Sequence, residues 1–135
     1  MVGNIISRWT NFLTEDGEKE WRQRDDEFIS GFNSKEEVIA AWESGWFCFF
    51  KAIKPVKTQD LESIIYIRND GHTVTEAINR QLVHYSYHIG QMVFLGKLLK
   101  VGNWQSLSIP IGDSSKYNKD KFCKDKGRRH FTDDL

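Results

Sequence analysis

Residues 73–100 read TVTEAINRQLVHYSYHIGQMVFLGKLLK and predict the longest helix of the chain. Thr73 and Glu76 form a capping box, in which each side chain satisfies a backbone N–H group at the start of a helix. Apolar residues then recur three or four positions apart as far as Lys100, which is the spacing of one helix face. At 1.5 Å per residue the helix is about 40 Å long, which is typical of a helix bundle.

Two histidines, His84 and His88, lie four residues apart within this segment. At that spacing both imidazoles lie on one helix face, about one turn apart, where they could bind a single metal ion. Zinc and related metals usually take three protein ligands in sites that keep an open position, so a third ligand is needed. No Glu lies between the histidines, which argues against a metalloprotease. The alternative is that both are ordinary polar residues at a packed helix interface.

A second helix is predicted after Ser34-Lys-Glu-Glu37, which is another capping box, and Pro55 ends it. Its apolar face is largely aromatic and is predicted to be buried core rather than a cofactor site. The stripe comprises Val38, Ile39, Trp42, Trp46, Phe49, Phe50 and Ile53.

An earlier helix is predicted from the first residues of the chain, because apolar residues from Val2 to Leu13 recur at helical spacing. Asp16-Gly17 is predicted to end it. No Ser, Thr, Asp or Asn cap precedes the pattern, so we expect the natural start of this helix to be missing.

The remaining segments carry weaker patterns. Ile64-Ile-Tyr-Ile67 is rich in β-prone residues but too short to imply a sheet, so we expect an extended segment. No further apolar face follows Gly102 and Pro110. We therefore expect one helical domain over residues 1–112 and a charged tail over residues 113–135. The basic run from Lys116 to His130 is interpreted as solvated, because it offers little for base stacking.

Composition excludes several classes of partner. Lys plus Arg and Asp plus Glu both number 19, so no global charge attracts nucleic acid or a membrane surface. No segment approaches the ~20 apolar residues of a membrane span. The two cysteines, Cys48 and Cys123, are far apart and favour a reduced, cytoplasmic setting. Cys48 lies in an aromatic helix and is predicted to be a small buried side chain rather than a nucleophile.

Seven segments together resemble a known family. They are GNIISRW at 3–9, DGEK at 16–19, WRQRD at 21–25, YIR at 66–68, HTV at 72–74, EAINRQ at 76–81 and HYSYHIGQ at 84–91. The last resembles the metal-binding helix of the DinB superfamily, and the combination resembles an uncharacterised DinB-like family of small bacterial proteins.

This resemblance implies an all-α, up-down four-helix bundle that binds nickel or zinc through three histidines, two of which correspond to His84 and His88. The third would fall immediately before Met1, so the resemblance implies a chain that lacks its first helix and third ligand. Either an internal methionine was taken as the start of a longer protein, which we favour, or the short form is real and has lost the intact site. His72 or His130 could instead complete the site.

The resemblance also implies a function, because DinB relatives include metal-dependent transferases that attach low-molecular-weight thiols to electrophiles. No catalytic residue is identified, although Tyr85, Tyr87 and Gln91 could line a substrate pocket, with Gln91 supporting a metal ligand. The alternative is a non-catalytic helical dimerisation module with a degenerate metal site. In both cases a missing helix would leave an apolar groove exposed, so a homodimer is expected.

Overall fold

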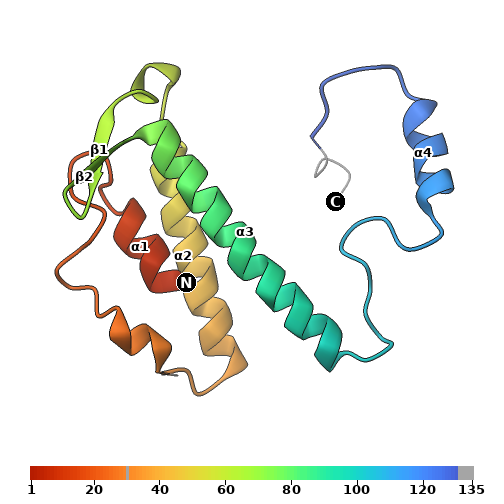
Figure 1. Cartoon of the computed structure of the whole chain (residues 1–135), viewed down its shortest axis with the longest axis horizontal. Coiled ribbons are helices and arrows are strands. Elements are labelled where there is room, and N and C mark those ends of the chain that lie inside the picture. Colours follow the sequence, from red (N-terminus) through yellow and green to blue (C-terminus); the bar gives the residue numbers. More distant parts are fainter. Residues whose placement is uncertain (30, 131–135) are drawn as a thin grey trace. The chain divides into compact units, whose positions relative to one another are not determined.

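The computed structural model describes residues 1–29 and 31–130, which form four α-helices and one antiparallel pair of strands (Figure 1). The elements are α1 (Val2–Trp9), α2 (Lys35–Ile53), β1 (Ile64–Ile67), β2 (Asp70–Thr73), α3 (Val74–Leu99) and α4 (Ser114–Phe122). Two short 3-10 helices cover Asp25–Phe28 and Thr58–Asp60. The chain divides into two compact units, residues 1–91 and the residues from 92 onward, and each is described separately.

Both predicted capping boxes are found at helix starts. Glu76 N–H donates to Thr73 Oγ1 over 3.1 Å and Thr73 N–H donates to Glu76 Oε2 over 2.8 Å, which completes the box before α3. Ser34 Oγ accepts from Glu37 N–H, but the Glu37 carboxylate accepts from Asn33 N–H, one residue earlier than a standard box. The predicted ends are also confirmed, since α2 stops before Pro55 and α3 stops one residue before Lys100.

The first helix is shorter than predicted. It ends at Trp9, and Asn11 then adopts a φ of 49°, in the left-handed region that ends a helix and that Asn tolerates well. This turn redirects the chain so that Phe12, only 4% exposed, still reaches the core. The apolar spacing therefore predicted the burial of Ile5, Trp9 and Phe12, but Leu13 is 46% exposed and the helix ends earlier than predicted.

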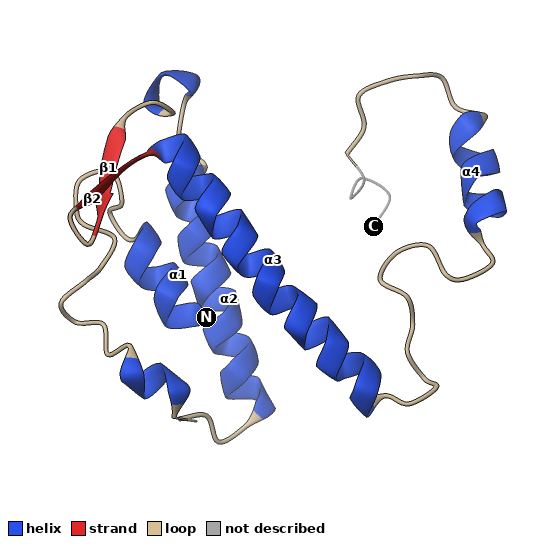
Figure 2. Cartoon of the chain, viewed as in Figure 1, coloured by secondary structure: helices blue, strands red, loops and turns tan. Residues whose placement is uncertain are grey.

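The expectation of an all-α fold is wrong, because β1 and β2 form an antiparallel hairpin that makes the protein mixed α and β (Figure 2). Ile64 pairs with Thr73 and Ile67 pairs with Asp70. The two residues between the strands, Arg68 and Asn69, have φ values of 57° and 64°. Two consecutive left-handed residues produce the tight turn whose twist matches a β-hairpin.

One side chain holds this turn in place. The Asp16 carboxylate accepts hydrogen bonds from the backbone N–H groups of Arg68 and Asn69, both over 2.8 Å, and from that of Glu18 over 2.7 Å. Beside it, Gly17 N–H donates to the carbonyl of Tyr66 over 2.8 Å. The loop that follows α1 is thus attached to the hairpin 50 residues later in the chain.

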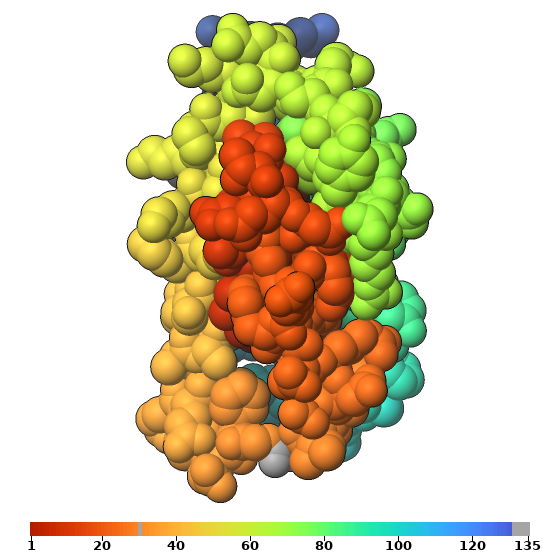
Figure 3. Space-filling model, turned by 90° about the vertical axis from the view of Figure 1, so that its left-hand side faces the viewer, coloured from red at the N-terminus to blue at the C-terminus, as the bar shows by residue number. Residues whose placement is uncertain are grey.

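The core of the first unit lies where α1, α2 and α3 meet the hairpin. Its buried residues are Ile5, Trp9, Phe12, Ile65, Val74, Ala77 and Tyr85. Aromatic rings of α2 pack against them edge to face, as with Phe49 on Trp9 at 4.8 Å between ring centroids. Buried Gly45 of α2 faces α1, and a Cβ there would be in van der Waals contact with Val2 at 3.4 Å. Figure 3 shows the residues of α1 and the following loop (red to orange) between α2 (yellow) and α3 (green).

The predicted burial of the whole α2 stripe is wrong in part. Val38, Ile39 and Phe50 are about half exposed, at 48%, 46% and 57%. Further large apolar side chains of α2 and α3 are also exposed in the first unit, namely Phe47, Leu82, Val83, Tyr87 and Ile89. The core thus uses only one side of each long helix.

In the second unit, the end of α3 contacts the segment that follows it. A Cβ on Gly96 would lie 3.0 Å from the Trp104 ring, so the glycine permits this close contact. The predicted charged tail contains a helix, α4, whose residues are all exposed. Within the described ranges, no helix is both long enough and apolar enough to cross a membrane.

We predict that Asp16→Ala lowers the free energy of unfolding by about 2 kcal/mol, because three backbone N–H groups lose a charged acceptor. Urea denaturation of the purified chain measures the change. Glu62→Ala is the control, since it removes an exposed carboxylate that makes no such contacts. A change in Asp16→Ala no larger than that of the control would contradict the proposed role of this carboxylate.

Candidate functional site

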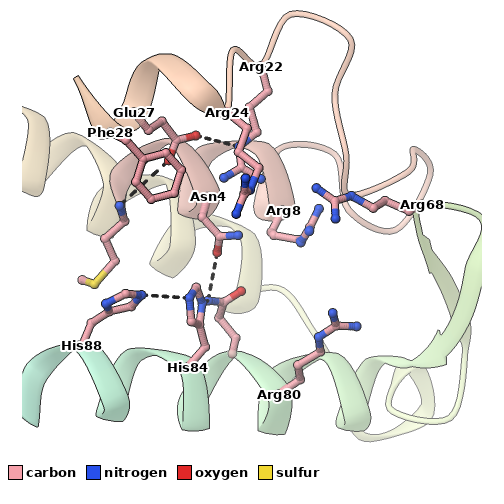
Figure 4. Close-up of a pocket in the computed structure, with 12 residues that line it drawn as sticks. Asn4, Arg8, Arg22, Arg24, Glu27, Phe28, Arg68, Arg80, His84 and His88 are labelled. Carbon is pink, nitrogen blue, oxygen red and sulfur yellow. Dashed lines mark hydrogen bonds and ion pairs between the residues drawn. The ribbon is translucent and has the colours of Figure 1, made fainter. Parts of the chain in front are cut away.

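A cavity of about 460 Å³ in the first unit is lined by α1, α3, the loop around residues 22–28 and the hairpin turn (Figure 4). His84 and His88 of α3 form part of its wall. Its most abundant side chain is arginine, with Arg8, Arg22, Arg24, Arg68 and Arg80. The remaining lining residues are Met1, Asn4, Glu27, Phe28 and Gln81.

The two histidines meet through one nitrogen each. His84 Nε2 and His88 Nε2 are 3.0 Å apart, and both side chains are partly buried. Two nitrogens that bind one tetrahedral zinc ion at 2.0–2.1 Å lie roughly 3.3 Å from each other. The sequence prediction that the pair shares one helix face is confirmed, and the separation of the two nitrogens suits two ligands of one metal ion.

Amide side chains contact the other nitrogen of each ring. Gln81 Nε2 donates to His84 Nδ1 over 3.1 Å and to Asn4 Oδ1 over 3.2 Å. At the far end, His88 Nδ1 is 3.3 Å from Gln91 Oε1. In this arrangement His84 carries its proton on Nε2 and donates it to His88 Nε2, while His88 Nδ1–H donates to Gln91. The ring orientations are therefore fixed by hydrogen bonds at both ends of the pair.

This network must change if a metal binds both Nε2 atoms. The His84 proton would move to Nδ1, and the Gln81 amide would turn so that its oxygen accepts from Nδ1–H. His88 already has the required tautomer, because Gln91 accepts from its Nδ1. Burial lowers the pKa of His84, and the neighbouring His88 and nearby positive charges lower it further. A lowered pKa favours the neutral imidazole, which is the form that binds metals.

A third metal ligand is not found beside the pair. Within residues 1–29 and 31–130, no group of three or more His, Cys, Asp or Glu side chains is placed to hold a metal ion. His72 lies in β2, and its Nε2 is 3.2 Å from the Arg80 guanidinium. His130 belongs to the second unit.

One carboxylate organises three of the arginines. Glu18 Oε2 lies 2.9 Å from Arg8, 3.3 Å from Arg22 and 3.2 Å from Arg68. Burial acts to raise the pKa of Glu18, but the hydrogen bond from Arg8 and the three positive charges outweigh it and lower the pKa. Glu18 is therefore ionised at neutral pH and joins α1, the following loop and the hairpin turn.

A second carboxylate, Glu27, fixes the deepest arginine. Its Oε1 accepts from Arg22 Nε over 2.7 Å, and the Arg22 side chain is only 6% exposed. Gly3 of α1 provides the space for this carboxylate, because a Cβ at that position would collide with the Glu27 side chain. A small residue in α1 thus allows the loop to bring Arg22 and Glu27 against the helix.

A buried serine positions the loop that carries Glu18. Ser7, fully buried in α1, donates to the Gly17 carbonyl over 2.9 Å and accepts from Lys19 N–H over 3.2 Å. Arg8 Nη1 also donates to the Gly17 carbonyl, over 2.6 Å. These bonds determine where Glu18 points, and so where the arginines gather.

The tyrosines considered from the sequence do not line the cavity. Tyr85 is 4% exposed and packs against Trp46, with ring centroids 5.1 Å apart, so it belongs to the core. Tyr87 is 62% exposed and packs against His88 at 5.2 Å. Cys48 is partly buried, with its Sγ 3.6 Å from Thr10 Oγ1.

The arginines are the part of the site that sequence reasoning missed. Arg24 forms an exposed ion pair with Asp25, with 3.4 Å between the charged atoms. Arg24 also lines the cavity and lies over the Phe28 ring at 5.2 Å. The signal that could have indicated the site is the run Trp21-Arg-Gln-Arg24, which places two arginines beside an aromatic residue in a connecting segment.

The fold and the site define a small mixed α and β domain in which a histidine pair faces an arginine-lined cavity. The model of a family described as "Protein of unknown function (DUF1572)" matches residues 1–113, so the chain belongs to this family. No curated protein and no solved structure is significantly similar to the chain.

We predict that Glu18→Gln lowers the free energy of unfolding by about 2 kcal/mol at pH 7, because Arg8 and Arg22 lose a shared counter-charge. Exposed Glu20→Gln is the control. Since the folded-state pKa of Glu18 lies below its ordinary value of 4.5, its stabilising effect is complete above pH 4.5 and is lost as the pH falls through the folded value. The difference between Glu18→Gln and the unaltered chain should therefore shrink at pH 3. An equal difference at both pH values would contradict the ionised role of Glu18.

Proposed function

We propose that this protein is a DinB-like metal-binding protein in which His84 and His88 hold a divalent ion, nickel or zinc. The observation that carries the proposal is the 3.0 Å separation of the two Nε2 atoms at the wall of a cavity. A pair of partly buried imidazoles in an open cavity leaves space for further ligands and for substrate. The third ligand would come from outside the described residues, from a second copy of the chain or from the substrate.

The surrounding residues have defined tasks in this proposal. Gln91 accepts from His88 Nδ1–H and keeps its Nε2 toward the cavity. Gln81 would do the same for His84 once its amide and that of its neighbour Asn4 have both turned, because Gln81 Nε2 now contacts both His84 and Asn4. When bound, the metal would supply Lewis acidity. The cavity volume falls within the range of small-molecule sites, so the substrate would be a metabolite rather than a macromolecule.

The proposed activity is a metal-dependent transfer that joins a low-molecular-weight thiol to an electrophile in the cytoplasm. It is supported by the sequence resemblance to DinB relatives together with the size and open face of the cavity. Fold and kinship do not by themselves determine chemistry. Metal binding therefore has to be measured before activity is assayed.

We predict that the chain, purified without a histidine tag, contains nickel or zinc when measured by inductively coupled plasma mass spectrometry. The His84→Ala/His88→Ala variant should lose this metal, because both ligands are removed. His72→Ala is the matched control and should keep it, since His72 contacts Arg80 and not the pair. Metal retained equally by the double variant, or absent from the unaltered chain even after incubation with either ion, would contradict the proposal.

A second candidate function is a non-catalytic dimerisation module. It is favoured by the large apolar side chains that α2 and α3 leave exposed, among them Phe47 at 70%, Leu82 at 63% and Val83 at 70%. Large exposed apolar side chains are typical of an interface when they lie together, and standard interfaces bury about 800 Å² on each partner.

For this candidate we predict a homodimer in multi-angle light scattering coupled to size exclusion. Phe47→Glu/Leu82→Glu should convert the dimer to a monomer, because two charges would be desolvated in the interface. Ile64→Glu is the control, since Ile64 is a similarly exposed apolar residue on β1. A monomeric unaltered chain at micromolar concentration would rule out this interface. Metal content measured on the same samples separates the two candidate functions.

A further inference from the structure

The cavity beside the histidine pair contains more positive charge than its carboxylates balance. Five arginines line it, whereas Glu27 is its lining carboxylate and Glu18, which is not a lining residue, pairs with three of the arginines. Both carboxylates are already engaged in ion pairs. In an ordinary structural network each buried guanidinium is matched by an acid. The excess here attracts small anions from solution.

The outer three arginines keep donors for a ligand. Each guanidinium has five N–H donors. For Arg80, the contact found within the described part of the chain is with His72, which is not an acid. Among the described residues, the acid that pairs with Arg24 is its exposed neighbour Asp25, at 3.4 Å, and the acid that pairs with Arg68 is Glu18. Arg24 and Arg68 are more than half exposed, so both side chains can rotate to meet a ligand.

The inner two arginines are rigid. Arg8 and Arg22 are 10% and 6% exposed and are fixed by Glu18 and Glu27. Burial lowers the pKa of Arg8, and although Glu18 raises it, the nearby charges of Arg22 and Arg68 lower it further. An anion bound in the cavity would be attracted by these fixed positive charges. Figure 4 shows that the arginines come from α1, the loop, the hairpin turn and α3 and surround one space.

We propose that this cavity binds a small organic oxyanion. Arg24, Arg68 and Arg80 contact the charged group directly, and the other end of the bound molecule is directed at the histidine pair. Phosphate and carboxylate groups each present two oxygens that can accept a pair of parallel hydrogen bonds from the planar guanidinium group. The volume of about 460 Å³ admits one metabolite that carries a phosphate or two carboxylates. The Phe28 ring, already stacked under Arg24, provides an apolar wall for its carbon skeleton.

This inference deepens the proposed function. It rests on that function only for which end of the bound molecule faces the histidine pair, because anion binding itself needs no metal. It also accounts for how a cation and five arginines can share one cavity. A divalent ion at the histidines would be repelled by the guanidinium groups, and a bound anion would offset that repulsion. Metal and anion should therefore tighten each other's binding by the same factor.

Isothermal titration calorimetry of the full chain tests the proposal after metal has been removed with a chelator. The probes are inorganic phosphate, phosphoserine, succinate and citrate, with chloride at equal ionic strength as the reference. We expect one saturable site for a phosphate or a carboxylate probe. The probe that binds more tightly shows whether the natural ligand carries a phosphate or carboxylate groups. The Arg24→Gln and Arg80→Gln variants should each weaken binding by about tenfold or more.

Two variants make the result decisive. Arg80→Lys keeps the charge but loses the fork of donors, so it should weaken binding nearly as much as Arg80→Gln. Lys35→Gln removes an exposed positive charge at the start of α2 and should leave binding unchanged. Because the titrations are made without metal, a failed metal site does not obscure the result. No probe binding above the chloride reference, or equal weakening in Lys35→Gln, would overturn the proposal.

Discussion

The site depends on one carboxylate, Glu18, which binds Arg8 of α1, Arg22 of the loop and Arg68 of the hairpin turn. Three segments that are distant in sequence meet at this group, and its low pKa keeps it charged. The neighbouring Asp16 fixes the same loop to the hairpin through backbone N–H groups. Asp16 and Glu18, two positions apart in the sequence, therefore have separate roles: Asp16 binds the hairpin turn, and Glu18 binds the arginines.

The histidine pair lies on α3, which also carries Arg80. α3 begins with a complete capping box, and its buried residues Val74, Ala77, Gln81 and Tyr85 hold one face against the core. His84 and His88 lie on the edge of that face, where they are partly buried and open to the cavity. The proposed metal site on α3 and the proposed anion site, whose arginines come from the loop, the hairpin turn and α3, would thus share one cavity.

The sequence predicted the parts of the fold that depend on local signals. Capping residues Ser34 and Thr73, together with apolar periodicity, were sufficient for α2 and α3. The hairpin was missed because its second strand, Asp70–Thr73, contains no β-prone pattern and its turn uses Arg68, a residue that rarely adopts a positive φ. The histidine pair was visible as a four-residue spacing within one helix. The arginines were not, since residues 8, 22, 24, 68 and 80 meet only through tertiary contacts.

The most direct test of the account is nitrogen-15 NMR of the histidine side chains during titration with zinc, in the presence of saturating phosphate or citrate. The account predicts that the Nε2 resonances of His84 and His88 shift together and reach a plateau at one zinc ion per chain. The resonances of His72 should remain unchanged. Zinc that leaves the Nε2 resonances of the pair unshifted, or that shifts only one of them, would contradict a shared metal site.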